Sequence, residues 1–543
     1  MKAGILVVLV AGCVGRVGEA PSAMDRRRPP DPVGGAGGAG GTAGPLPPPA
    51  SGAAGGRLRR LTSAELRNSV RDLLGDDVGQ GELEPDSFRD GFASIGATYA
   101  AISARGLEQY DQAAQAAAHQ VFADPARRAA VLGCAPAPDL APCLRAFLGG
   151  FGRRAWRRPL TAEELDDYTA VGLEAARLLD AGQALEQLTV ALLTSPHFLY
   201  RVELGSPDAA GRFRYGGWEL ASRLSYFLWN STPDVALLDA AAAGALDTTA
   251  GLRAAAARLV QSPRARAGFS GGFGRDLLWF DALADTPKND PRFTDPLRAA
   301  MEREALRLFE ARLDPGSDLL DLFTTTRTFV DPELAALYGL PRPAGPAPAD
   351  LPPDGPRAGL LGTAAFLSLY SAQDRTSPTA RGVFVRERLL CQPMPMPPDN
   401  VDVVLPPGNL TTRQRLEQHR RNDGCRGCHE LSDPVGYAFE AFDWIGAHRD
   451  RENGLPIDTS GSLDGFAFAD ARALSAHLRD LPEVSACLLR NLFRTANGHL
   501  ETPADEPTLA AWGAAFQAAG RSLPAFLTEL VASDGFRVVS PAP

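Results

Sequence analysis

The sequence predicts a mainly α-helical protein, with several consecutive small helical domains after a signal peptide and a disordered Gly/Ala/Pro linker. Capping boxes, in which Glu follows Thr by three residues, predict helix starts at Thr62 and Thr161. Clear alternating strand patterns are scarce. Proline follows a capping residue at four further predicted starts: Ser195-Pro196, Thr232-Pro233, Ser377-Pro378 and Asp433-Pro434.

The size and charge of the chain limit its organisation and its partners. Its 543 residues suffice for three to five domains, each with its own core. A net charge of −10 argues against nucleic acid as a partner. Apart from residues 5–11, no apolar stretch approaches the roughly 18–20 residues of a membrane-spanning helix.

The N-terminus predicts export and lipidation. Residues 1–12 have the pattern of a lipoprotein signal peptide, and Val10-Ala11-Gly12-Cys13 matches a lipobox in which Cys13 becomes lipidated. Residues 13–56 are rich in Gly, Ala and Pro and cannot bury enough apolar surface to fold, so they form a disordered tether. We expect a lipid-anchored protein of the cell envelope, at the periplasmic face of the outer membrane or at the cell surface.

The motif that carries chemistry is Cys425-Arg426-Gly427-Cys428-His429. Cys-x-x-Cys-His is the attachment pattern of c-type haem, in which two thiols bind the porphyrin and the histidine binds the iron. The pattern predicts one covalent haem c held by Cys425, Cys428 and His429. Its assembly needs an oxidising, extracytoplasmic compartment, which agrees with the export signal.

The surroundings of this haem remain open in the sequence. A helix that starts at Ser377-Pro378 carries Arg381, Arg386 and Arg388, and arginine suits haem propionates, with Arg381 and Arg386 as the candidates. A methionine as sixth ligand raises the potential, a histidine lowers it, and an open position allows oxygen chemistry. The available ligands are Met394, Met396, His419, His448, His477 and His499.

The other cysteines suggest disulfides. Cys134 and Cys143 bracket a Pro-rich loop that a disulfide could close in an oxidising compartment. Cys391 and Cys487 either pair with each other or stay reduced.

The chain also resembles the multi-domain proteins of planctomycetes and myxobacteria that are built from tandem domains of unknown function with a cytochrome-c-like segment. The resemblance covers residues 57–537. It depends on signposts that include Arg60-Leu61-Thr62, Phe151-Gly152-Arg153-Arg154-Ala155, Ser195 to Glu203, Leu220 to Trp229, Arg375-Thr376-Ser377-Pro378 and the Cys425 to Gly446 segment.

This resemblance implies five consecutive modules and an extracytoplasmic, haem-bearing protein. The modules are an N-terminal helical domain, a second helical domain, a central helical domain, a haem-c-like domain and a C-terminal helical domain, at 57–125, 126–205, 206–345, 355–460 and 465–540. His448, His499 and the two methionines Met394 and Met396 stand where the family has other residues, so as axial ligands they would be particular to this chain.

Two functions are open at this point. The first is a lipid-anchored monohaem protein that transfers electrons to a redox partner protein or performs a haem-dependent redox reaction; if it is an enzyme, it is an oxidoreductase. The second is a structural or binding protein in which Cys425 and Cys428 form a disulfide or part of a metal site. A zinc site would recruit Cys391 and either Cys487 or His429. No phosphate-binding loop or nucleophile elbow is found.

Overall fold

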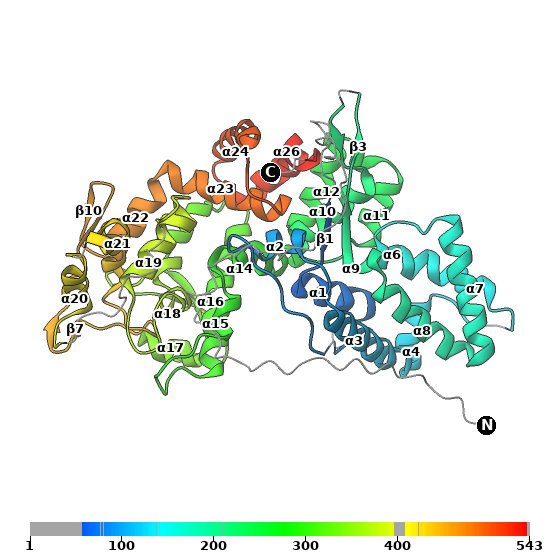
Figure 1. The fold of residues 1–543 in the computed structure, drawn as a ribbon, viewed down its shortest axis with the longest axis horizontal. Helices are drawn as coiled ribbons and strands as arrows, with labels where there is room; N and C mark the ends of the chain where they lie inside the picture. The colour runs from blue at the N-terminus through cyan, green and yellow to red at the C-terminus, as the bar shows by residue number, and fades with distance from the viewer. Residues whose placement is uncertain are drawn as a thin grey trace, which may run out of the picture. The chain divides into compact units, whose positions relative to one another are not determined.

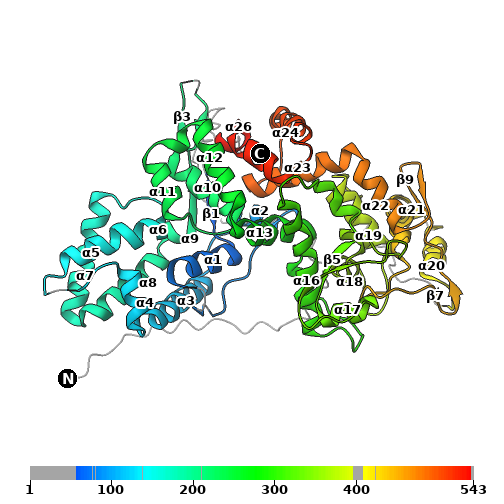
Figure 2. The same ribbon diagram turned by 180° about the vertical axis from the view of Figure 1, so that it is seen from behind.

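A computed structural model of the chain describes residues 57–75, 78–79, 81–136, 138–209, 211–395, 408–421 and 423–539, without the side chains at 281 and 423–425 (Figures 1 and 2). The predicted signal peptide, Cys13 and the tether lie outside these residues. The prediction of a mainly helical protein is confirmed, because the strands of the described part form only two-stranded sheets. In the same part, no helix is both long and apolar enough to cross a membrane.

The first hydrophobic core is formed by the N-terminal helices. It extends from Leu61 to Leu199 and includes Tyr226 from the next segment. Its helices are α1 (Ser63–Leu74), α3 (Ala104–Phe122), α4 (Pro125–Leu132), α5 (Ala141–Phe147), π-helix η2 (Leu148–Gly152), α6 (Arg153–Trp156), α7 (Ala162–Leu178), α8 (Ala181–Thr194) and α9 (Pro196–Leu199).

The second core contains the remaining segments, from Tyr215 to Val539. Helix α12 packs on α25, so the C-terminal helices close against the middle of the chain (Figure 1). Its helices are α10 (Gly217–Trp229), α11 (Val235–Ala242), α12 (Thr249–Gln261), α13 (Pro263–Phe269), π-helix η4 (Ser270–Gly274), α14 (Arg275–Leu278), α15 (Asp281–Ala284), α16 (Asp295–Glu310), α17 (Pro332–Tyr338), α18 (Ala364–Leu369), α19 (Pro378–Phe384), π-helix η8 (Val385–Leu389), α21 (Asp423–Gly436), α22 (Ala471–Asp480), α23 (Pro482–Asn497), α24 (Glu506–Ala518), α25 (Leu523–Ala532) and α26 (Asp534–Arg537). Helix α20 (Thr412–His419) precedes α21 in the chain and contributes no described residue to either core.

The expectation that each small domain has its own core is therefore wrong. The described residues share two cores, because the apolar faces of short helices are covered by helices from other segments. The Pro-rich stretch 341–356 contains β6 (Ala347–Asp350), which pairs with β5 (Arg327–Val330). The other short pairs are β3 (Ser206–Pro207) with β4 (Phe213–Arg214), β7 (Arg451–Glu452) with β8 (Leu455–Pro456), and β9 (Gly461–Leu463) with β10 (Phe466–Phe468).

Most predicted helix starts are correct. The capping boxes at Thr62 and Thr161 are both formed, and Ser195 and Ser377 cap α9 and α19 with proline in the first turn. Thr232-Pro233 does not start a helix. Helix α11 begins two residues later, because Asp234 accepts the hydrogen bond from the Leu237 amide.

Strand pairing brings the two ends of the N-terminal half together. Strand β1 (Arg57–Arg60) runs antiparallel to β2 (Tyr200–Glu203), with Arg59 opposite Arg201. Helix α2 (Ala93–Tyr99) packs on β1 and on α23, so this short sheet lies next to the C-terminal part of the chain.

A cluster of buried charges surrounds this sheet, and we call it the buried ion cluster. It consists of Arg59, Arg201, Arg223, Glu65 and Glu203, all less than 9% exposed. Glu203 pairs with Arg201 and Arg223, and Arg201 also donates to Glu65 at 3.0 Å. Arg59 donates to the Ala496 carbonyl at 3.1 Å, and Arg223 donates to the Asn497 amide oxygen at 2.9 Å. The cluster therefore joins β1, α1, β2, α10 and α23.

The charges in this cluster depend on one another. Burial alone would raise the pKa of Glu203, but Arg201, Arg223 and Arg59 lower it to about 2. Burial and the neighbouring Arg201 lower the pKa of Arg59 to about 10. A carboxylate buried among three guanidinium groups is stable only while all of them are in place.

Two disulfides are formed among the described residues. Cys134 pairs with Cys143 at the positions where the sequence suggested a closed loop. Cys391 pairs with Cys487, which connects the segment after η8 to α23. Because Cys391 and Cys487 are bonded to each other, neither thiol can be a zinc ligand. The zinc site that would recruit them is therefore contradicted.

We predict that Glu203→Gln lowers the free energy of unfolding by about 3–5 kcal/mol, because it leaves buried guanidinium groups unpaired. A depressed carboxylate pKa stabilises the fold above the unfolded pKa of about 4.3 and ceases to do so as the pH falls toward the folded value. Denaturant unfolding at pH 6 and at pH 3 should show a smaller pH effect in the variant than in the native chain.

The matched control is Glu529→Gln, which removes the exposed ion pair between Glu529 and Arg253. Its unfolding should change little, because exposed ion pairs contribute little to stability. Equal effects of the two substitutions would contradict a central role for the buried ion cluster.

Candidate haem site

The Cys-x-x-Cys-His motif lies in helix α21, side by side with α19 in both views (Figures 1 and 2). Two glycines allow the two backbones to approach closely. A Cβ atom at Gly382 would come within 1.9 Å of the Ser432 carbonyl oxygen, and one at Gly436 within 1.9 Å of the Pro378 carbonyl oxygen. This close packing fixes the helix that carries Cys428 and His429.

The prediction that Asp433 caps a helix starting at Pro434 is wrong. Helix α21 begins at Asp423 and contains Pro434 in its last turns. Asp433 instead lies one helical turn after His429, and its side chain is fully buried. The apparent capping residue is therefore a partner of the histidine.

A chain of hydrogen bonds orients the His429 ring. Its Nδ1 lies 2.9 Å from an Asp433 carboxylate oxygen, and the Thr379 hydroxyl donates to the same carboxylate at 2.7 Å. Thr379 belongs to α19, so the close packing of the two helices positions the histidine. A carboxylate on Nδ1 favours the tautomer whose Nε2 carries the lone pair for a metal.

This arrangement fits the iron-ligand half of a haem site. The imidazole is 17% exposed, so it is neither enclosed in the core nor fully in solvent. Nδ1 is occupied by Asp433, so Nε2 is the nitrogen that a metal would bind. The backbone of Cys425 is described as part of α21, but its side chain lies outside the described part, so the thiol geometry stays a prediction.

His419 is the histidine that the structure brings to this motif. It ends α20, and its ring centroid lies 5.1 Å from that of His429 in an edge-to-face arrangement. The sequence offered it only as one histidine among several, because its distance from His429 depends on how α20 folds back.

The other histidines have different surroundings. His499 is buried, and burial lowers its pKa to about 4; its Nδ1 lies 2.7 Å from the Leu500 carbonyl oxygen. His448 is exposed beside Phe442, and His477 stacks on Phe466 at 3.7 Å. Met394 is half-buried, and Met396 lies outside the described residues.

The two arginines predicted for haem propionates bind the protein itself. Arg381 is fully buried and donates to the carbonyls of Phe439 and Leu367 at 2.8 and 3.0 Å, and burial lowers its pKa to about 10. Arg386 donates to the Leu431 carbonyl at 3.1 Å and pairs with Asp464 at 2.7 Å. Both arginines therefore hold the backbone around α21, which contradicts a propionate role in this arrangement.

The described residues contain no group of three or more His, Cys, Asp or Glu side chains that could hold a metal ion. The fold and the site thus define a mainly helical protein that presents a Cys-x-x-Cys-His motif on one helix fixed by its neighbour.

Five family models, each described as a protein of unknown function, match this chain in tandem. They are DUF1587 at residues 59–123, DUF1595 at 143–203, DUF1592 at 216–340, DUF1588 at 357–452 and DUF1585 at 464–536. The chain belongs to the family of proteins that carry these five domains in this order. No curated protein and no solved structure matches it.

We predict that Gly436→Ala destabilises the contact between α19 and α21, because the new methyl group would meet the Pro378 carbonyl. Thermal unfolding should occur at a lower temperature. In Gly427→Ala, the matched control in the same helix, the methyl group would meet nothing within 4 Å. That variant should keep or gain stability, by up to about 1 kcal/mol. A melting temperature unchanged in Gly436→Ala would contradict the close packing.

Proposed function

We propose that this protein is a monohaem c-type protein of the cell envelope that transfers electrons to a partner protein or performs a haem-dependent redox reaction. The observation that carries the proposal is the hydrogen-bonded chain from Thr379 through Asp433 to His429, next to Cys428. A buried carboxylate on the far ring nitrogen is typical of metal-binding histidines.

The haem would supply one-electron chemistry, and this chain's residues would set its conditions. Cys425 and Cys428 would hold the porphyrin covalently, and His429 would bind the iron through Nε2. Asp433 would increase the electron donation of the imidazole, which favours the oxidised iron and lowers the potential. Apolar residues that follow the motif, such as Phe439 and Phe442, are fully buried and so support the helix.

The export signal supports the same proposal. The two disulfides need an oxidising compartment, which agrees with the predicted export. A lipid anchor on Cys13 would keep the protein at the membrane surface, with the family domains beyond the tether.

The experiment that tests this function is a pyridine haemochrome spectrum of the chain expressed with a c-type maturation system, together with haem staining of a denaturing gel. We expect covalent haem in the native chain and none in Cys425→Ala/Cys428→Ala. The matched control is Cys134→Ala/Cys143→Ala, which removes two cysteines away from the motif and should keep haem. Absence of haem in the native chain, or covalent haem in the Cys425/Cys428 variant, would overturn the proposal.

We further expect His419 to be the sixth ligand, because α20 ends next to His429; the two rings, whose centroids lie 5.1 Å apart, would have to separate for the haem to enter between them. His419→Ala should then change the oxidised haem from low spin to high spin in the visible and electron paramagnetic resonance spectra. His448→Ala is the control, since His448 is exposed beside Phe442. A native spectrum in His419→Ala would exclude His419 as a ligand.

A further inference from the structure

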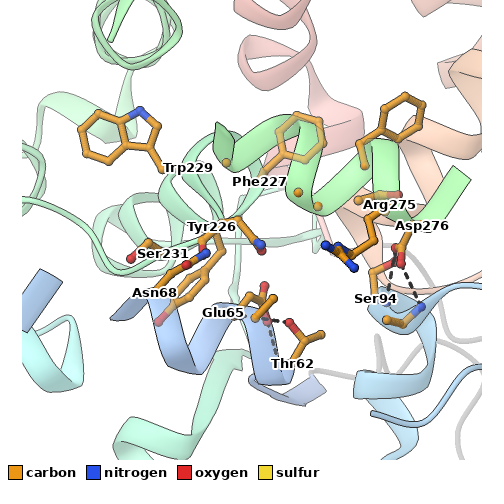
Figure 3. Close-up of a pocket in the computed structure, with 18 of the residues that line it drawn as sticks. Thr62, Glu65, Asn68, Ser94, Tyr226, Phe227, Trp229, Ser231, Arg275 and Asp276 are labelled. Atoms are coloured by element: carbon orange, nitrogen blue, oxygen red, sulfur yellow. Dashed lines mark hydrogen bonds between the residues drawn. The ribbon is translucent and has the colours of Figure 1, made fainter. Parts of the chain in front are cut away.

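A large cavity of the described part lies away from the Cys-x-x-Cys-His motif. Its volume is about 640 Å³, within the range of small-molecule sites. Four of the five family-matched segments line it: Asn68 comes from the first, Arg201 from the second, Arg275 from the third and Ala496 from the fifth. We call this cavity the interdomain cleft (Figure 3).

Arginine is the most frequent charged residue of its lining. Six arginines stand against four carboxylates among the described lining residues; Arg59 and Arg201 pair with Glu203, Arg264 pairs with Asp72 and Arg275 pairs with Glu302, whereas Arg67 and Arg71 extend from α1. The arginines are Arg59, Arg67, Arg71, Arg201, Arg264 and Arg275. The carboxylates are Glu65, Asp72, Asp86 and Asp276.

The carboxylates already accept hydrogen bonds from the protein. Asp86 accepts from the Ser63 amide at 2.9 Å, at the start of α1. Asp276 accepts from the Ala93 amide at 3.1 Å and from the Ser94 hydroxyl at 2.7 Å, at the start of α2. Since amides at helix starts carry partial positive charge, these contacts offset the negative charge further.

Several arginines are within reach of a ligand. Arg67 and Arg71 are exposed and lie one turn apart on α1. Figure 3 shows Arg275 pointing from the opposite wall toward Glu65 and Thr62 on α1. Guanidinium groups bind carboxylate, sulfate and phosphate groups through paired hydrogen bonds, so opposed arginines would hold such groups from both sides.

The wall opposite α1 includes the π-helix η4, whose glycines place backbone without side chains at the cleft. In η4, a Cβ atom at Gly271 would meet nothing within 4 Å, and Gly271 lines the cleft. The space next to Gly271 is therefore the cleft itself. The segment has a structural counterpart in η2, whose sequence Leu148-Gly149-Gly150-Phe151-Gly152 differs from that of η4 only at its first residue. Short π-helices are frequent at functional sites.

A second chamber adjoins the first. It has a volume of about 360 Å³, and the ion pair between Asp72 and Arg264 borders both chambers. Arg154 adds another positive charge there, and its guanidinium donates to the Asp72 carbonyl at 2.6 Å. The two chambers together therefore have room for a ligand that carries more than one charged group.

We propose that the interdomain cleft binds an anionic small molecule that carries at least two carboxylate, sulfate or phosphate groups. The inference does not rest on the proposed haem, because none of the lining residues belongs to the matched segment 357–452. The fold that joins the family domains would then create the site, and no single domain would bind the ligand.

The test is isothermal titration calorimetry on the full chain with three probes: inorganic phosphate, inorganic sulfate and citrate. Gly271→Leu fills the cleft, and Gly149→Leu is its matched control, since a Cβ atom there also meets nothing within 4 Å but the residue lies outside the cleft lining. Arg71→Gln removes one positive charge, and Arg177→Gln on α7 removes one elsewhere on the surface.

We expect at least one probe to bind, and the probe that binds most tightly identifies the anionic group. Gly271→Leu and Arg71→Gln should weaken binding by about tenfold or more, which corresponds to about 1.4 kcal/mol, while both controls bind as the native chain does. No binding of any probe at about 10 mM, or equal binding by all four variants, would overturn the proposal. His429→Ala should bind normally, which separates this test from that of the haem.

Discussion

The buried ion cluster is the interaction on which the rest of the structure depends. Glu203 lies among three arginines that come from β1, β2 and α10, and the same arginines reach the backbone of Ala496 and the side chain of Asn497 in α23. Removing charges from water is costly and is offset only when every partner is present. Correct assembly of four sequence segments is therefore a condition for burying any one of these charges.

This constraint explains why five family domains share two cores. Three of the five segments span only about 60–75 residues, and a helical segment of that length buries too little surface to be very stable alone. Here the first two segments form one core, and the other three form the second. The buried ion cluster connects the cores, and the interdomain cleft lies against it, because Arg59, Arg201 and Glu65 belong to both. The five domains in tandem are therefore parts of one fold.

The sequence predicted the features that depend on neighbouring residues. Capping boxes at Thr62 and Thr161, the helix start at Ser377 and the disulfide Cys134–Cys143 all involve residues at most nine positions apart. It missed the features that depend on long-range contact. The bond from Arg59 to Ala496 joins residues 437 positions apart, and no local pattern marks it. Asp433 shows a third case: its local capping pattern was misleading, because α21 runs through this residue and its carboxylate bonds to Thr379 and His429 instead.

The disulfide between Cys391 and Cys487 makes the stability of the fold depend on redox conditions. It closes a loop across 96 residues and joins the fourth family segment to the fifth. In the chain-entropy model, closing a loop of that length stabilises the fold by about 4–5 kcal/mol. A chain in a reducing compartment lacks this stabilisation. Its C-terminal half would then unfold more readily and be cleaved more easily by proteases. The bond therefore makes the stability of the C-terminal half depend on an oxidising environment.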